Sequence, residues 1–206
     1  MAGAIRNPYF ELDPTAAGNT IEMICWHLDR YDRQRASTSS RAAVALSAGA
    51  IILAGDTIVL SRFLEAPIRS LDWRIVLFLL SFGVLTASLV MLSLYRSTGV
   101  LVTRRGSRAT FLQLEDAPIS LVFNGGDTLK KAQTFEAFKA MLSAQSMQDI
   151  LQAAQVELWI CIQQHRYRYH QLRLAVRLLR YASISLLLGM ALVLAAEIFL
   201  AGNVLA

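Results

Sequence analysis

The sequence predicts an all-α membrane protein with three transmembrane helices and a mostly helical cytoplasmic domain. Three observations support this prediction: a high proportion of apolar residues, their concentration in three long blocks, and the uneven distribution of arginine and lysine. Of the 206 residues, 55% are hydrophobic and only 17% are charged, whereas a soluble domain has about a quarter of its residues charged. The apolar blocks are therefore the first feature to explain.

Each apolar block has close to the ~20 residues that a helix needs to cross a ~30 Å hydrocarbon core at ~1.5 Å per residue. The blocks are residues 42–60, 75–95 and 181 to about 205. The second block contains no charged residue. In a soluble protein, a helix that is apolar on every face must be surrounded by other parts of the protein. A chain this short is too small to bury such a helix completely. The alternative, a soluble helical bundle, is therefore less favoured than a membrane protein.

Arginine and lysine set the expected orientation. Only three of the 20 basic residues lie in the connection between the first two blocks, and the others lie in residues 1–41 and 96–180. Because basic flanks stay in the cytoplasm, we expect the N-terminus inside and the C-terminus outside. The predicted organisation is a cytoplasmic arm and amphipathic helix at 1–41, spans at 42–61, 75–95 and 181–202, an external loop at 62–74, and a cytoplasmic helical domain at 96–180.

The first and third blocks each carry one carboxylate. Asp56 lies 15 residues after Arg41, and Glu197 lies 17 residues after Arg180. Because both helices are expected to run outward, these spacings put the two carboxylates at nearly the same depth. Ionisable residues within spans tend to face a bundle interior or a water-filled path. Two interpretations remain: Asp56 and Glu197 line a pore, or they mark the outer interface, where carboxylates are tolerated.

Motifs of catalysis and metal binding are missing from the sequence. We find no Ser-His-Asp arrangement, no P-loop and no dinucleotide fingerprint, and the two cysteines and three histidines are dispersed. We therefore expect no enzyme activity, no metal and no resident cofactor. The net charge of +5 does not require a nucleic-acid partner either, because arginines beside a membrane face anionic lipid.

The segment before the first span is predicted to change from irregular to helical. Residues 1–18 contain turn signals and predict an irregular arm. Apolar residues from Ile21 onward repeat at helical spacing, with Thr20 as a candidate cap. The run Ser37–Ser40 predicts a bend before the membrane.

The segment after the second span is predicted to be irregular first and then helical. Glycine and proline punctuate it, and short β-type runs predict a small irregular or β element near 97–123. Ser146 followed by Asp149 resembles a capping box, so a long helix is expected to begin there. No proline or glycine follows before Gly189. This helix is therefore predicted to continue into the third span.

Residues 120–131, SLVFNGGDTLKK, combine an apolar run, a glycine pair and two lysines. The pattern predicts a short strand and then a helix capped by Asp127 or Thr128. The free N–H groups at such a helix start hold anions, and Lys130 and Lys131 would add positive charge. The alternative is an ordinary strand–turn–helix junction without a ligand.

Taken together, these segments resemble the transmembrane effectors of Pycsar antiphage systems and, more loosely, the two-span SLATT effectors. The resemblance rests on LDRYDRQRAS at 28–37, SLVFNGGD at 120–127 and HRYRYHQLRLA at 165–175, and it extends over roughly residues 20–200. It implies an effector of abortive infection in the bacterial inner membrane. A neighbouring cyclase would make a cyclic nucleotide, a cyclic pyrimidine monophosphate, which triggers homo-oligomeric assembly and membrane disruption.

On this resemblance we expect the ligand to be bound at the glycine junction and by two arginines of the N-terminal helix. These residues are Asn124, Gly125, Gly126, Asp127, Lys130, Lys131, Arg33 and Arg35. Asp56 and Glu197 are the expected pore residues. The alternative function is a membrane-anchored scaffold or immunity-type protein that binds a protein partner through its cytoplasmic helices.

Overall fold

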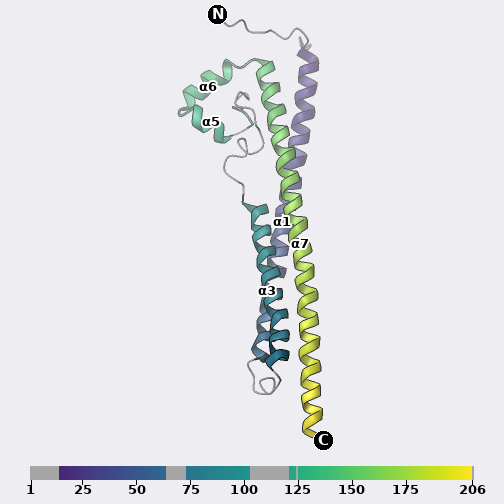
Figure 1. The fold of residues 1–206 in the computed structure, drawn as a ribbon. Helices are drawn as coiled ribbons and strands as arrows, with labels where there is room; N and C mark the ends of the chain where they lie inside the picture. The colour runs from purple at the N-terminus through teal and green to yellow at the C-terminus, as the bar shows by residue number, and fades with distance from the viewer. Residues whose placement is uncertain (1–13, 64–72, 103–120, 124, 206) are drawn as a thin grey trace, which may run out of the picture. The chain divides into compact units, whose positions relative to one another are not determined.

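The computed structural model of the chain describes residues 14–63, 73–102, 121–123 and 125–205. These residues form helices and turns, with no strand among them (Figure 1). The helices are α1 (Pro14–Phe63), α3 (Trp73–Leu101), α5 (Gly125–Lys131), α6 (Phe135–Ser143) and α7 (Met147–Leu205). Three of them, α1, α3 and α7, contain apolar stretches long enough to cross a membrane. The predicted all-α fold with three transmembrane helices is confirmed.

The β element expected near 97–123 is not present in the described part of that range. Residues 97–101 continue α3, residues 121–123 form bends, and 103–120 lie outside the described residues. Ser97 and Val100 are fully buried on the same face as the rest of α3. Packing of this face therefore extends the helix past Gly99, one of the glycines that punctuate the segment.

Helix α1 starts earlier than expected and has no break. Residues 14–18, predicted to be irregular, are helical, and Thr20 lies inside the helix rather than at its cap. Pro14 suits the first helical turn, where its missing N–H costs nothing. The bend expected at Ser37–Ser40 is also wrong, because Thr38 is buried on the packed face and the helix continues through it.

The chain divides into two compact units. Unit 1 contains residues 1–35 and 104–166, and unit 2 contains residues 36–103 and 167–206. Both boundaries at 35 and 166 fall inside long helices. As a result, α1 and α7 each contribute residues to both units.

Unit 1 is held by a small apolar core between α1 and α7. Ile24, Leu151 and Ala154 are buried together, and Leu28 and Phe123 pack against them. The capping box at the start of α7 is confirmed. The Ser146 hydroxyl and backbone N–H donate to the Asp149 carboxylate at 2.6 and 3.0 Å, and the Asp149 N–H donates to Ser146 Oγ at 3.2 Å. These bonds satisfy N–H groups that a helix start leaves free.

The inward face of unit 2 is built mainly from small and weakly polar side chains. On α3 the buried positions recur at alternating steps of four and three residues, the spacing of left-handed helix packing. They are Leu79, Gly83, Thr86, Val90, Ser93, Ser97 and Val100. Small buried residues of α1 are Thr38, Ala42, Ala45 and Gly49. Those of α7 are Ala175, Ala182, Ser185 and Gly189. Small side chains let helices approach closely, which is how helices associate within a membrane.

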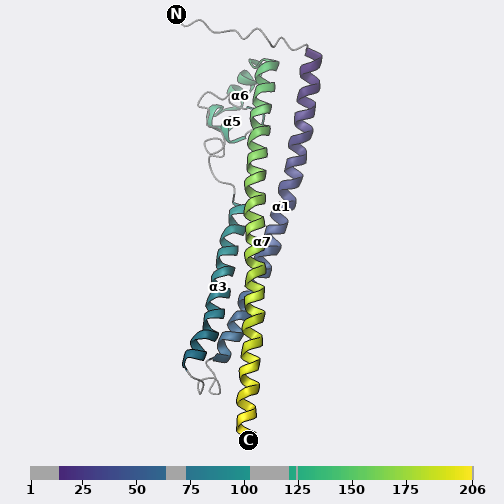
Figure 2. The same cartoon turned by 45° about the vertical axis from the view of Figure 1, so that its right-hand side comes forward.

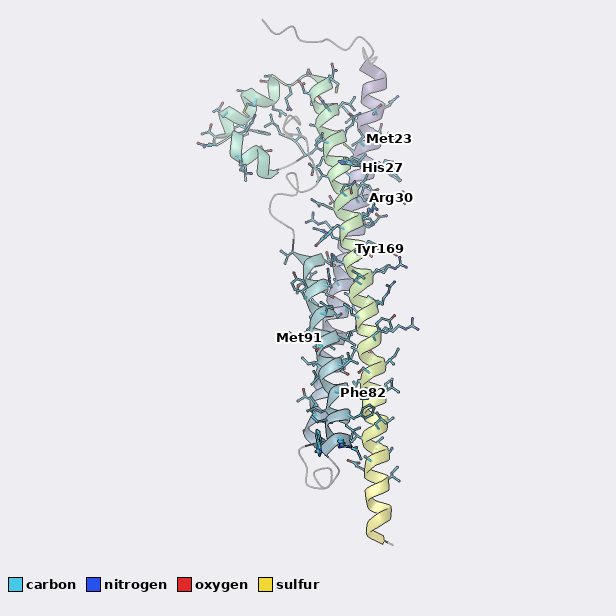
Figure 3. All side chains as sticks on the ribbon, in the orientation of Figure 1. Met23, His27, Arg30, Phe82, Met91 and Tyr169 are labelled. Carbon is cyan, nitrogen blue, oxygen red and sulfur yellow. The ribbon has the colours of Figure 1, made fainter. Side chains whose placement is uncertain are left out.

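The outward face of unit 2 carries the large apolar side chains instead. Val44, Met91 and Leu187, one on each helix, are between 60% and 67% exposed, and Met91 points away from α7 (Figure 3). In water, apolar surface on all three helices is unfavourable, whereas against lipid it has no cost. Unit 2 therefore has the inside-out pattern of a membrane-spanning three-helix bundle, in which α3 runs beside α7 (Figures 1 and 2).

Candidate functional site

A polar layer lies inside the bundle of unit 2, where α3 meets α7. Thr86 Oγ1 lies 2.9 Å from Ser185 Oγ and donates to its own helix at Phe82 O, 2.8 Å away. Ser185 Oγ is also within 3.3 Å of Phe82 O. Both hydroxyls are buried. Within the hydrocarbon layer such hydrogen bonds fix the relative register of the two helices, because no water is available there to replace a broken bond to a buried hydroxyl.

Asp56 of α1 belongs to the same layer. It is only 2% exposed, so it faces the bundle and not lipid. A Cβ at the neighbouring Gly55 would lie 3.4 Å from Leu186 of α7, next to Ser185. The two helices therefore bring Asp56 level with Ser185 and Thr86. Asp56, Thr86 and Ser185 are termed the polar layer below.

Apolar contacts enclose the polar layer along the bundle on both sides. On one side Leu79 and Val193 are buried together, with Leu60 packed against them. On the other side, Val90 and Leu94 of α3 fill the space beside Gly49 of α1. The layer is thus a polar island in an apolar bundle, and its carboxylate is the main candidate in unit 2 for binding a proton or a cation.

Glu197, the second expected pore residue, is not brought to Asp56. It is exposed, and it lies 12 residues beyond Ser185, a rise of ~18 Å along α7. Helix α1 ends at Phe63, only seven residues after Asp56. The expectation of equal depth is therefore not met, and the pair does not form one polar ring within this chain.

A second group of polar contacts joins α3 and α7 nearer the other end of the bundle. The Ser93 hydroxyl donates to Ala175 O at 2.9 Å, and Arg96 donates to Gln171 Oε1 at 3.2 Å. Ser97 Oγ is fully buried and has no partner among the described residues. These contacts were missed in the sequence because hydropathy averages serine and threonine into the span. Their spacing of four and three residues was the available signal.

Four of the expected ligand residues of the glycine junction lie exposed on the short helix α5 (Gly125–Lys131). Gly125, Gly126, Lys130 and Lys131 have accessible side-chain positions, and Asn124 falls outside the described residues, as does the side chain of Asp127. Helix α5 begins at Gly125, so neither Asp127 nor Thr128 caps it. Instead, the Thr128 hydroxyl donates to Leu121 O at 2.8 Å and so bonds α5 to a residue that precedes it.

Arg33 and Arg35 are exposed on α1. Arg33 pairs with Asp29 at 3.1 Å, one turn earlier on the same helix. Because both side chains are about two-thirds exposed, water and salt screen this ion pair and it contributes little to stability. Among the described residues, no hydrogen bond or ion pair joins either arginine to α5.

The comparisons with known proteins identify no relative: no family, no curated protein and no solved structure matches the chain.

Proposed function

We propose that the chain is an effector of antiphage defence that disrupts the bacterial inner membrane when its cytoplasmic region binds a cyclic nucleotide. The observation that supports this most is the sharing of α1 and α7 between unit 1 and the membrane bundle. A ligand that favours one packing of these helices in unit 1 also biases the helices that build unit 2. For this, the ligand must bind the active arrangement more tightly than the resting one.

On the ligand side, the proposal uses the glycine junction. Phe123 packs against the core of Ile24, Leu151 and Ala154, and the exposed Gly125 follows it by two residues. An anionic nucleotide held by Lys130 and Lys131 would therefore be one short turn from the contact between α1 and α7. The proposed ligand is a cyclic pyrimidine monophosphate from a neighbouring cyclase.

On the membrane side, the proposal uses the polar layer. Asp56 is buried in the resting bundle, enclosed by small and apolar side chains. Homo-oligomeric assembly that separates α1 from α3 and α7 would expose the carboxylate to a water-filled path. Asp56 is the proposed pathway residue, and Glu197 is proposed to lie at the far end of α7, outside the bundle.

The test is co-expression with a candidate cyclase while membrane potential is recorded with a voltage-sensitive dye. We expect depolarisation only with an active cyclase. Equal depolarisation with a catalytically dead cyclase would exclude ligand gating.

Variants of Lys130 and Lys131 test whether the ligand binds at the glycine junction. Lys130→Gln together with Lys131→Gln is expected to weaken the response to the cyclase at least tenfold, because a lost charge-assisted hydrogen bond costs ~1.5–3 kcal/mol. Lys139→Gln on α6 is the matched control, since Lys139 is also an exposed lysine of unit 1 on a short helix. An unchanged response in the double variant would remove the junction from the ligand site.

The second candidate function is a scaffold or immunity-type protein, and the surface of unit 1 favours it. Trp26, Phe135 and Trp159 are each more than half exposed, and aromatic residues of this kind are common at protein interfaces. A scaffold would leave the membrane potential unchanged both with and without an active cyclase. The same co-expression experiment therefore separates the two functions.

A further inference from the structure

The exposed face of α7 carries arginines that neither the bundle nor the proposed function uses. Arg173, Arg177 and Arg180 recur at steps of four and three residues, so they share one face of the helix. All three are exposed. Tyr169 lies one turn earlier on this face, and its side chain points away from α3 (Figure 3). Arg173, Arg177 and Arg180 are termed the arginine stripe.

Contacts within unit 2 place this stripe beside the membrane spans and not beyond their end. Ala42, Val100 and Leu172 pack together, so Arg173 lies where the apolar part of α1 begins. Farther along, Leu186 approaches Gly55. Because α1 and α7 advance in parallel between these two contacts, Arg180 lies level with about Gly49. That level is ~12 Å past Arg41 at ~1.5 Å per residue.

The surroundings of the stripe at this depth are apolar. Val44 of α1, Leu92 of α3 and Val176 of α7 are all exposed, as expected of side chains that face lipid tails. A guanidinium in such a layer is costly unless it reaches a polar partner. Arginine meets this need by extending its apolar stem along the helix and keeping its charged end at the headgroups.

Among the described residues of the bundle, no acidic side chain is placed to neutralise the stripe. The carboxylates in the described part of unit 2 are Asp56, which is buried within the bundle, and Glu197, which lies 17 residues beyond Arg180. No ion pair involves the stripe among the described residues. None of the described carboxylates of unit 2 is therefore a partner for the three guanidinium groups.

We propose that the arginine stripe binds the phosphate groups of anionic phospholipids and draws their headgroups along α7 into the bilayer. The guanidinium group is suited to this ligand because its planar N–H groups grip a phosphate with two parallel hydrogen bonds. Three such groups over two turns hold headgroups at successive depths. The result is a local thinning of one leaflet beside α7, which is a property of the resting protein and needs no nucleotide.

Lipid fits these observations better than a protein partner does. A partner chain would have to place carboxylates within the same apolar layer, beside Val176 and Ile184, at the cost of burying them. A phospholipid already carries its phosphate at the edge of this layer and its tails within it. The proposed occupant is therefore an anionic glycerophospholipid.

The test measures lipid binding to the full-length chain in detergent by native mass spectrometry. Phosphatidylglycerol is titrated against phosphatidylcholine, which has the same tails and no net charge. We expect wild type to retain phosphatidylglycerol preferentially. Arg177→Gln with Arg180→Gln is expected to weaken this binding about thirtyfold, or ~2 kcal/mol at ~1.4 kcal/mol per tenfold, because each basic residue near anionic lipid contributes ~1 kcal/mol.

Two matched variants keep the result interpretable. Arg30→Gln with Lys139→Gln removes the same charge from exposed positions of unit 1, and it is expected to bind phosphatidylglycerol like wild type. Arg177→Lys with Arg180→Lys keeps the charge but not the paired hydrogen bonds, and it is expected to lie between wild type and the glutamine variant. Far-ultraviolet circular dichroism checks that every variant retains its helices.

Several outcomes would overturn the proposal. Equal binding of the two lipids would show that the stripe does not select anionic lipid. Equal weakening by both glutamine variants would show that binding depends only on the net charge of the chain and not on the stripe. Full competition by inorganic phosphate would make the site one for a free anion. A changed oligomer size in Arg177→Gln with Arg180→Gln, with lipid binding unaltered, would assign the stripe to a protein partner.

Discussion

At the scale of single residues, Gly83 shows how little space the bundle leaves between helices. A Cβ at this position would lie 2.5 Å from Leu60 Cδ2 and 3.1 Å from Leu60 Cγ. The end of the Leu60 side chain can rotate away from a methyl group, so alanine is expected to be tolerated. A larger side chain would push α1 and α3 apart.

We therefore expect Gly83→Leu to destabilise the bundle by ~1–3 kcal/mol, the usual cost of overpacking. Val84→Leu is the control, because Val84 is 58% exposed on the lipid side of the same helix. Thermal unfolding in detergent, followed by circular dichroism, is the measurement. Similar melting temperatures for the two variants would mean that the contact at Gly83 is not tight in the membrane.

Asp149 carries a second prediction at this scale, on pH. Hydrogen bonds from the Ser146 hydroxyl and backbone N–H hold the pKa of Asp149 below its usual value. Because the folded pKa is lower than the unfolded one, the ionised carboxylate stabilises the start of α7 at pH values above the unfolded pKa of ~3.9. This stabilisation is lost as the pH falls below that value, through the folded pKa.

The protection of the amides of residues 147–150 against hydrogen exchange, corrected for the intrinsic rate, is expected to decrease as the pH falls through this range. Ser146→Ala is expected to show fast exchange already at neutral pH, since loss of an N-cap costs ~1 kcal/mol. Gln148→Ala, an exposed change in the same turn, is the control. Slow exchange in Ser146→Ala would show that the cap does not limit fraying.

At the scale of helices, α3 and α7 are held in register by hydroxyl groups. The coupling between Thr86 and Ser185 is measurable with a double-mutant cycle of Thr86→Val and Ser185→Ala. We expect a coupling energy of ~0.6 kcal/mol, typical of hydrogen bonds between helices in a membrane. Ser88→Ala is expected to be neutral, because Ser88 is exposed and donates only to Val84 O of its own helix. A coupling of zero would mean that the two hydroxyls find other partners when separated.

The presence of the long helices was predictable from the sequence, whereas the register in which they pack against one another was not. The capping box at Ser146 and the unbroken course of α7 depend on residues close together in the chain. The contacts of Gly55 with Leu186 and of Thr86 with Ser185 depend on which faces meet. The sequence predicts a membrane boundary at Arg180, whereas packing places Arg180 level with about Gly49. The expected match in depth between Asp56 and Glu197 was wrong for this reason.

The candidate site was predicted only in part, again for a physical reason. Asp56 stood out because a carboxylate is rare in an apolar block. The other residues of the polar layer, Thr86 and Ser185, did not, because threonine and serine lower the mean hydropathy of a span only slightly. A pattern of small and polar residues at steps of four and three identifies such faces. It was present in α3 and went unused.

At the scale of the whole molecule, the two units have separate cores, so damage to one is expected to spare the other. Ile24→Ala removes a side chain that is 2% exposed from the core of unit 1, and it is expected to destabilise that unit by ~2–5 kcal/mol. Hydrogen exchange is expected to increase in residues 147–160 and to stay slow in residues 75–95. Met23→Ala, at a neighbouring exposed position, is the control. Faster exchange in both regions with Ile24→Ala would mean that the units unfold together.

Unit 1 consists of two separate segments of the chain, and this determines the order in which its parts are synthesised. Its first segment ends at residue 35, and its second begins at residue 104. Between them the ribosome makes the hairpin of two spans that belongs to unit 2. Ile24 and Leu28 therefore leave the ribosome long before Leu151 and Ala154, which cover them. Unit 1 is therefore completed only after both of these spans have been made.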